Sequence, residues 1–178
     1  CPDCGPQLVF TDGVGRTLAR RDDALAAACA ALRRGGIVAL KGLGGYQLLA
    51  DAGNSEAVAR LRARKGRPRK PFAVMLPSLD AARRLCVLAA PAEAALCSPA
   101  APIVLLPRRA PADDAALPVS DAVAPDNPCL GVMLPCTPLH RLLLDDFPAA
   151  LVATSGNVSG EPLCIDDGEA RDRLGAIA

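Results

Sequence analysis

The chain has very few aromatic residues: its 178 positions include no Trp, one Tyr and three Phe. Its core must therefore be built mainly from Leu, Val and Ala, and the sequence offers no row of aromatic side chains on which single-stranded bases would stack. It also has no apolar run near the roughly 18 residues that a membrane-spanning helix needs. With 51% hydrophobic and 22% charged residues, we expect a globular chain with no membrane span.

The start of the chain lacks the basic and then apolar stretch of a secretory signal, since it opens Cys1-Pro-Asp-Cys4. A start without Met suggests a fragment or an excised domain. Six of the eight cysteines stand singly among apolar neighbours, which indicates reduced, buried thiols and a cytoplasmic protein. These six are Cys29, Cys86, Cys97, Cys129, Cys136 and Cys164.

The net charge is only +1, from 20 basic and 19 acidic residues, so no overall field draws the chain to nucleic acid or to a membrane. Any preference for anions must be local, and positions 62–70 hold six basic side chains in nine positions. Lysine is rare, with three lysines against seventeen arginines. Lys65 and Lys70 lie in the basic run, and Lys41 opens a glycine loop. An ammonium group is a compact charge on a flexible stem, which suits single phosphate oxygens.

Short apolar segments alternate with helical segments, which predicts an α/β fold of mixed layers, a sheet with helices on its faces. We expect extended, irregular segments at 65–71, where prolines forbid a helix, and at 107–128. The pattern does not give the strand order. The expected strands are 8–10, 37–40, 47–50, 72–76, 103–106, 130–134 and 150–154. The expected helices are about 22–34, 54–64, 78–87, 137–146 and 167–174, with a short one after Pro91.

Two basic segments are candidates for binding phosphate. In the loop 41–46, glycines after a strand let the backbone approach a ligand, but the loop matches neither the phosphate-loop nor the dinucleotide motif, so a plain connecting turn is an equal interpretation. In the basic run, prolines reduce the entropy lost on gripping an anion, and Lys65, Arg67 and Lys70 are placed to meet several phosphate oxygens. The alternative there is a solvated charged loop with nonspecific RNA contact.

A third polar segment, Thr154–Gly160, follows an apolar strand. The hydroxyls of Thr154, Ser155 and Ser159 and the amide of Asn157 are suitable partners for phosphate and magnesium. A helix cap and turn would use the same residue types. Together with the lysine segments, this segment predicts a site for a polyanion, a nucleotide triphosphate.

Other candidates are weaker. His140 is the only histidine, at helical spacing with apolar residues, so a structural role is favoured over a catalytic one, and the sequence supports no Ser-His-Asp or Cys-His pairing. Asp51 could bind a metal or cap the next helix. Cys1 and Cys4 have the spacing of a zinc knuckle, but zinc takes four ligands. We therefore expect them to be the trailing half of a site whose other half lies upstream.

Five motifs occur together and in order. They are Cys-Pro-Asp-Cys-Gly-Pro, Ala-Leu-Lys-Gly-Leu-Gly-Gly-Tyr, Leu-Arg-Ala-Arg-Lys-Gly-Arg-Pro-Arg-Lys-Pro-Phe-Ala-Val-Met, Gly-Val-Met-Leu-Pro with Pro-Leu-His, and Ala-Thr-Ser-Gly-Asn-Val-Ser-Gly-Glu-Pro. In this combination the chain resembles, over essentially its whole length, the YrdC-like domain of the HypF family of hydrogenase maturation carbamoyltransferases. The wider YrdC relatives, which make threonylcarbamoyl-adenylate for tRNA modification, share only part of the set.

The resemblance implies a twisted mixed sheet flanked by helices, with residues 1–6 as the trailing half of a zinc finger and residues 7–178 as a nucleotide-binding domain incomplete at its C-terminal end. It implies ATP and magnesium as ligands, and zinc only in a full-length protein. Carbamate derived from carbamoyl phosphate would attack ATP to give carbamoyl-adenylate. The carbamoyl group would then pass to HypE, for the cyanide ligand of nickel–iron hydrogenase. Nucleotide binding without turnover is one expected behaviour of such a fragment.

The resemblance also assigns roles to residues. Lys65 and Arg67 match the catalytic Lys-x-Arg element that holds phosphates, with Lys70 beside it. In the polar segment, Ser155 and Asn157 match the Ser-x-Asn element, and Thr154 and Ser159 flank it. Lys41 and Tyr46 fall on the pocket loop, where Tyr46-Gln47 replaces the family's usual Phe-His and leaves the role of that His open. The alternatives are threonylcarbamoyl-adenylate synthesis, weak binding of double-stranded RNA, and a purely structural domain.

Overall fold

A mixed six-stranded sheet forms the centre of the structure, a computed structural model that describes residues 4–109 and 117–178. The strand order is β3-β4-β8-β5-β7-β6. All neighbours are antiparallel except β5 and β7. The predicted α/β fold with a mixed sheet is therefore confirmed, and the structure adds the strand order. The strands are β3 (Val38–Lys41), β4 (Tyr46–Asp51), β5 (Ala73–Met75), β6 (Val104–Pro107), β7 (Cys129–Met133) and β8 (Leu151–Ser155).

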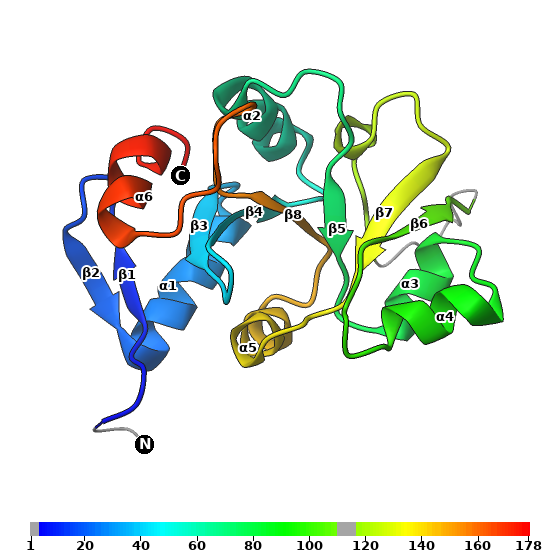
Figure 1. Ribbon diagram of the computed structural model, residues 1–178, viewed down its shortest axis with the longest axis horizontal. Coiled ribbons are helices and arrows are strands. Elements are labelled where there is room, and N and C mark those ends of the chain that lie inside the picture. Colours follow the sequence, from blue (N-terminus) through cyan, green and yellow to red (C-terminus); the bar gives the residue numbers. More distant parts are fainter. Residues whose placement is uncertain (1–3, 110–116) are drawn as a thin grey trace.

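Helices and a small hairpin surround this sheet (Figure 1). The helix starts and ends were predicted well where capping residues mark them, as in α5 and α6. The hairpin strand β2 was not predicted, because three of its four residues are exposed and its apolar pattern is weak. The helices are α1 (Arg21–Arg33), α2 (Ser55–Lys65), α3 (Leu79–Leu85), α4 (Ala90–Leu96), α5 (Pro138–Asp146) and α6 (Asp167–Leu174), with a 3-10 turn, η1 (Asp121–Val123), and the hairpin of β1 (Val9–Thr11) and β2 (Thr17–Arg20).

The sheet separates two apolar cores, because successive side chains of a strand point to opposite faces. Val74 and Val152 belong to the core that α2 covers. Met75 and Leu151, their chain neighbours, belong to the core that α1 and α5 cover. In Figure 1 α2 lies above the sheet, and α1 and α5 lie below it. The two faces are therefore served by different helices.

Helix α2 delivers its last residue, Lys65, to the sheet. The helix starts where the Asn54 side chain accepts a hydrogen bond from the Ala57 amide at 3.0 Å, and it ends at Gly66, which adopts the left-handed conformation with φ 64°. The extended loop was expected at 65–71, but in the structure it starts one residue later, at Gly66. Lys65 is helical because the chain turns only at the glycine that follows it.

The cysteines do not form the uniform set that the sequence suggested. Cys29, Cys86 and Cys164 are buried free thiols as expected, but Cys97 and Cys136 are exposed. The expectation is wrong for these two because each lies at a helix end, where side chains leave the core. Among the described residues, no helix is long and apolar enough to cross a membrane.

Candidate functional site

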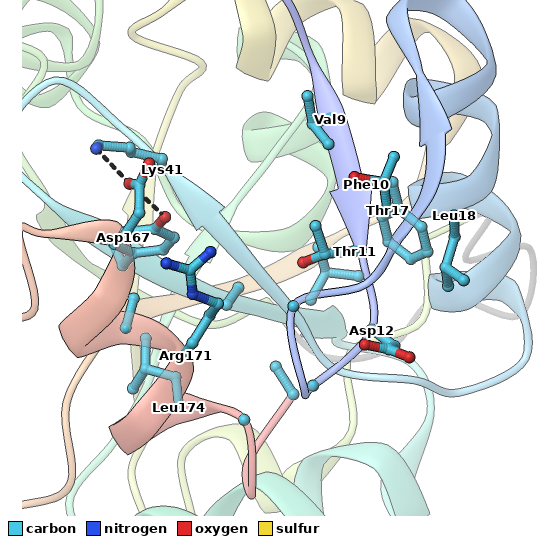
Figure 2. A pocket seen from close by; sticks show the side chains of 18 of the residues that line it. Val9, Phe10, Thr11, Asp12, Thr17, Leu18, Lys41, Asp167, Arg171 and Leu174 are labelled. Atoms are coloured by element: carbon cyan, nitrogen blue, oxygen red, sulfur yellow. Dashed lines mark hydrogen bonds and ion pairs between the residues drawn. The ribbon is translucent and has the colours of Figure 1, made fainter.

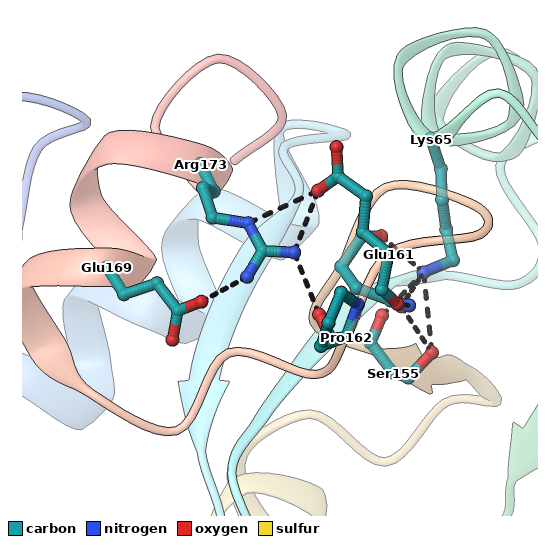
Figure 3. A network of polar contacts seen from close by, with 7 residues as sticks. Lys65, Ser155, Glu161, Pro162, Glu169 and Arg173 are labelled. Atoms are coloured by element: carbon teal, nitrogen blue, oxygen red, sulfur yellow. Dashed lines mark hydrogen bonds and ion pairs between the residues drawn. The ribbon is translucent and has the colours of Figure 1, made fainter.

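The side chain of Lys65 joins two segments that lie ninety residues apart in the sequence. Its Nζ donates to the carbonyl oxygens of Ser155 and Asn157, both at 2.6 Å, and to the Asn157 side-chain Oδ1 at 2.8 Å. The Ser155 hydroxyl lies 3.5 Å from Nζ and donates to the same Asn157 Oδ1 at 2.6 Å. Figure 3 shows Lys65 reaching down from α2 to Ser155 at the end of β8. Three of the residues predicted to hold phosphate therefore meet.

The environment of Lys65 is unusual for a lysine. The residue is 1% exposed, and within residues 4–109 and 117–178 its ammonium contacts neutral oxygens only. Burial, and then the charge of nearby Arg67, lower the pKa of Lys65 from 10.5 to about 8. A buried cation that lacks a carboxylate partner leaves positive charge uncompensated, and an anion at this place would supply what the protein does not.

The basic run of residues 62–70 adds further positive charge next to Lys65. The Arg62 guanidinium donates to five backbone carbonyls, among them those of Arg67 and Lys70, and Arg67 donates to the carbonyls of Lys70 and Pro71. Both guanidinium groups also lie over the ring of Phe72, at 4.5 and 5.2 Å. Within residues 4–109 and 117–178, neither arginine nor Lys65 takes part in an ion pair. The loop is therefore held by several hydrogen bonds and carries net positive charge.

Helix α6 fixes the other wall of the site. The Asn157 Nδ2 donates to the Glu161 carbonyl at 2.6 Å, which leaves Oδ1 facing Lys65. The Glu161 carboxylate pairs with Arg173 at 2.7 Å, and Arg173 also contacts Pro162 and Glu169 (Figure 3). Hydrogen bonds to these carboxylates raise the pKa of Arg173. A continuous polar network thus runs from α6 to the Lys65 ammonium.

The side chains of Lys41 and Tyr46 contact Asp167 of α6 and not Lys65. Both contact one carboxylate oxygen of Asp167, at 2.5 and 2.8 Å, at the rim of a cavity of about 570 Å³ between β1, β3 and α6. Figure 2 shows Lys41 and Asp167 on one wall, with Val9 of β1 on the opposite one. Burial and the hydrogen bond to Asp167 raise the pKa of Tyr46 to about 12. The structure therefore does not bring these two side chains to Lys65, although the Tyr46 carbonyl accepts from the Gly156 amide at 2.7 Å.

The remaining predicted residues do not contact the Lys65 ammonium in the described structure. Ser159 is exposed, and its amide donates to the Lys65 carbonyl at 2.9 Å. Lys70 is exposed, and Thr154 is half-buried on the strand. Asp51 accepts a hydrogen bond from the Gly53 amide at 2.9 Å, as a turn residue does.

The zinc prediction is not tested by the structure. Cys1 lies outside the described residues, and Cys4 is an exposed free thiol. Among the residues that are described, no group of three or more His, Cys, Asp or Glu side chains is arranged to hold a metal ion. The two cysteines therefore remain a predicted half-site.

Sequence reasoning missed one cluster. The Cys136 Sγ lies 3.5 Å from His140 Nδ1, and His140 Nε2 lies 3.0 Å from the Gln47 side-chain Oε1. The sequence supported no Cys-His pairing, but the structure brings these two side chains into contact. Cys136 lies four positions before His140 and next to Thr137, which starts helix α5, but its apolar neighbours predicted a buried thiol.

Comparison with known proteins agrees with this fold. The profile of the Sua5/YciO/YrdC family, which carries the description telomere recombination, matches residues 30–178. The chain belongs to this family. It is 53% identical, over all 178 residues, to the carbamoyltransferase HypF of Rhodobacter capsulatus, and 46% identical over 172 residues to that of Synechocystis. It spans only 23% and 22% of the length of these two curated relatives.

Solved structures place the chain in the same group. All of it matches full-length HypF in its phosphate- and nucleotide-bound form, with a TM-score of 0.86, 39% identity and 22% of that chain covered. It also matches T. kodakarensis HypF, with a TM-score of 0.90, 34% identity and 22% coverage. Sua5 of P. abyssi shares the fold, with a TM-score of 0.75 and 22% identity over 90% of this chain and 46% of that one. The YrdC-like resemblance to HypF is thereby confirmed.

Proposed function

We propose that this chain is the nucleotide-activating part of a carbamoyltransferase, where ATP and carbamate combine to form carbamoyl-adenylate. One observation carries the proposal: the Lys65 ammonium is buried against neutral oxygens beside Arg67, and no carboxylate among the residues that the structure describes balances it. A triphosphate is the kind of ligand that this charge favours. The similarity to HypF, one structure of which holds phosphate and nucleotide, supports the choice of ligand.

The reaction needs placement and charge more than a covalent nucleophile. A carbamate oxygen attacks the α-phosphorus, a new O–P bond forms, the bond to the bridging oxygen breaks, and pyrophosphate leaves with the electron pair. Lys65 and Arg67 would stabilise the charge on the phosphate oxygens as the bond breaks. The exposed Ser155 hydroxyl and the segment through Ser159 would position the triphosphate.

Magnesium fits this site as an ion carried by the nucleotide. The described residues supply no carboxylate cluster for it. Mg²⁺ commonly keeps several waters and takes substrate phosphate oxygens as ligands. The Ser155 hydroxyl, which is exposed at the end of β8, is the neutral oxygen best placed to join that shell. The bound ion would neutralise phosphate charge, and Lys65 would hold the same phosphates from the protein side.

Later steps belong to the proposal as well. The carbamoyl group would come from carbamoyl phosphate by way of carbamate, and it would pass on to HypE during maturation of nickel–iron hydrogenase. The support is the identity of 53% to a protein named carbamoyltransferase HypF. Because the chain spans less than a quarter of that relative, these steps would involve parts of the protein beyond this chain.

A direct assay tests the adenylation step. Ammonium carbamate supplies the carbamate itself, so the assay needs no upstream domain. With ATP and magnesium present, we expect pyrophosphate release that rises with carbamate and stays at background without it. Titration calorimetry with ATP and magnesium checks binding separately. Absence of ATP binding would contradict the proposal. Pyrophosphate release that needs threonine and bicarbonate in place of carbamate would favour threonylcarbamoyl-adenylate synthesis instead.

A further inference from the structure

Cys136, His140 and Gln47 form a line of contacts that the proposed nucleotide chemistry does not use. Cys136 is exposed, whereas His140 is 1% exposed. The His140 ring joins the thiol on one side, at 3.5 Å from Nδ1, to the Gln47 side-chain oxygen on the other, at 3.0 Å from Nε2. A nucleophile, a base and a group that orients the base are the parts of an activated thiol.

The contacts lead us to assign the proton of the His140 ring to Nε2. The Gln47 atom that faces Nε2 is Oε1, which can only accept, so Nε2 donates to it. Nδ1 is then left with a lone pair that faces the Cys136 thiol. Burial lowers the pKa of His140, which keeps the ring neutral and able to take a proton. His140 is held in this position because its backbone amide donates to the Thr137 hydroxyl at 3.1 Å.

Helix α5 favours negative charge at this sulfur. Cys136 directly precedes Thr137, the N-cap, and the start of a helix carries partial positive charge. Negative charge that develops on the sulfur during its attack therefore lies close to this partial positive charge. Cys97 provides the contrast within the same molecule. It is also exposed, but it caps the C-terminal end of α4, where a helix disfavours negative charge, and no histidine contacts it in the described structure.

We propose that Cys136 is a modification site that reacts with the disulfides of low-molecular-mass thiols, with His140 as the base and Gln47 as a positioning residue. The sulfur of Cys136 attacks one sulfur of the disulfide, a new S–S bond forms, and the old one breaks. The proton of Cys136 passes to His140 Nδ1 and then to the departing thiolate, so no external oxidant is needed beyond the disulfide itself.

The location of this site gives it a connection to the proposed nucleotide site. Gln47 of β4 pairs directly with Ser155 of β8 in the sheet. The reactive thiol and the Lys65 contacts are therefore linked through one strand pair. The reactivity of Cys136 does not depend on nucleotide binding, so it can be tested whether or not ATP binds.

The test uses oxidised glutathione as the probe, with adducts at each cysteine measured over time by peptide mass spectrometry. We expect Cys136 to react at least about tenfold faster than Cys97 in the same sample, since positioned bases accelerate proton transfer by this much or more. Gln47→Leu should slow adduct formation at Cys136 several-fold and leave the rate at Cys97 unchanged. Gln47→Glu, which keeps an oxygen acceptor for Nε2, should restore the rate.

Two results would overturn the proposal. One is equal rates at Cys136 and Cys97 in the unaltered protein, because exposure alone would then explain the labelling. The other is a Gln47→Leu rate at Cys136 that matches the unaltered protein, because the oriented base would then play no part. Both measurements use proteins that keep the buried His140, so neither depends on a variant that fails to fold.

Discussion

Lys65 and Lys41 each make close contacts with oxygen atoms, but they are in opposite electrostatic situations. Lys65 is buried and, within the described structure, meets only the neutral oxygens of Ser155 and Asn157. Lys41 is half-exposed, and Asp167, also exposed, balances its charge. The partners thus differ in charge and not in distance: a carboxylate balances the charge of Lys41, whereas no carboxylate in the described part of the chain balances that of Lys65. Under the proposed function, Lys65 is therefore the lysine that attracts the anion.

The largest effect should follow from removing the buried charge. We expect Lys65→Met to lower the affinity for ATP and magnesium about 100-fold, or roughly 3 kcal/mol, because the buried positive charge that attracts the phosphates is lost. Titration calorimetry measures this. Arg84→Met, on the exposed surface of α3, is the matched control and should bind normally. Unchanged affinity in a folded Lys65→Met protein would show that the phosphates bind elsewhere.

The next largest effect should be the contribution of Lys65 to the pH dependence of stability. The pKa of Lys65 is about 8 in the folded protein, against an ordinary value of 10.5. Between these values the unfolded chain holds a proton that the folded one has lost, so the free energy of unfolding rises with pH in this window. The gain has an upper bound of roughly 3 kcal/mol.

Urea unfolding at several pH values measures this gain as the difference between the unaltered protein and Lys65→Met. Tyr46 works in the other direction, because its pKa is raised to about 12 and stability falls as the unfolded tyrosine ionises above its ordinary value of 10. The difference curve removes this contribution, since both proteins contain Tyr46. A flat difference between pH 8 and 10.5 would contradict the lowered pKa of Lys65.

A single substitution should give Lys65 a carboxylate partner, as Asp167 is for Lys41. Asn157→Asp places a carboxylate where Oδ1 now lies, 2.8 Å from Nζ. We expect ATP affinity to fall about tenfold, since the carboxylate competes with phosphate for the ammonium, and the rise of stability above pH 8 to disappear. Calorimetry and the same unfolding series measure both. Asn157→Ala is the control for loss of the amide alone, and it should keep the pH-dependent rise.

The sequence predicted much of the fold because local chemistry marks it. Thr137 and Pro138 define the start of α5, and the apolar strands were identified within one or two residues. It also identified Lys65, Ser155 and Asn157 as one group, by resemblance. It could not predict that Asp167, 126 residues after Lys41, takes up that lysine and Tyr46, because this pairing depends on where α6 packs. Nor could it separate exposed Cys136 from buried Cys29, since exposure depends on the tertiary position of each helix end.

The smallest effect should come from freeing Lys41. Asp167→Asn removes the carboxylate that balances this lysine and accepts from Tyr46. Because both members of the pair are largely exposed, we expect a loss of less than about 1 kcal/mol in stability, measured by urea unfolding. ATP affinity should stay within about twofold, since Lys41 lies on the wall of the cavity between β1, β3 and α6, which Lys65 does not line. A much larger change in affinity would mean that Lys41 and Tyr46 reach the nucleotide after all, and that the glycine loop belongs to the site as its sequence suggested.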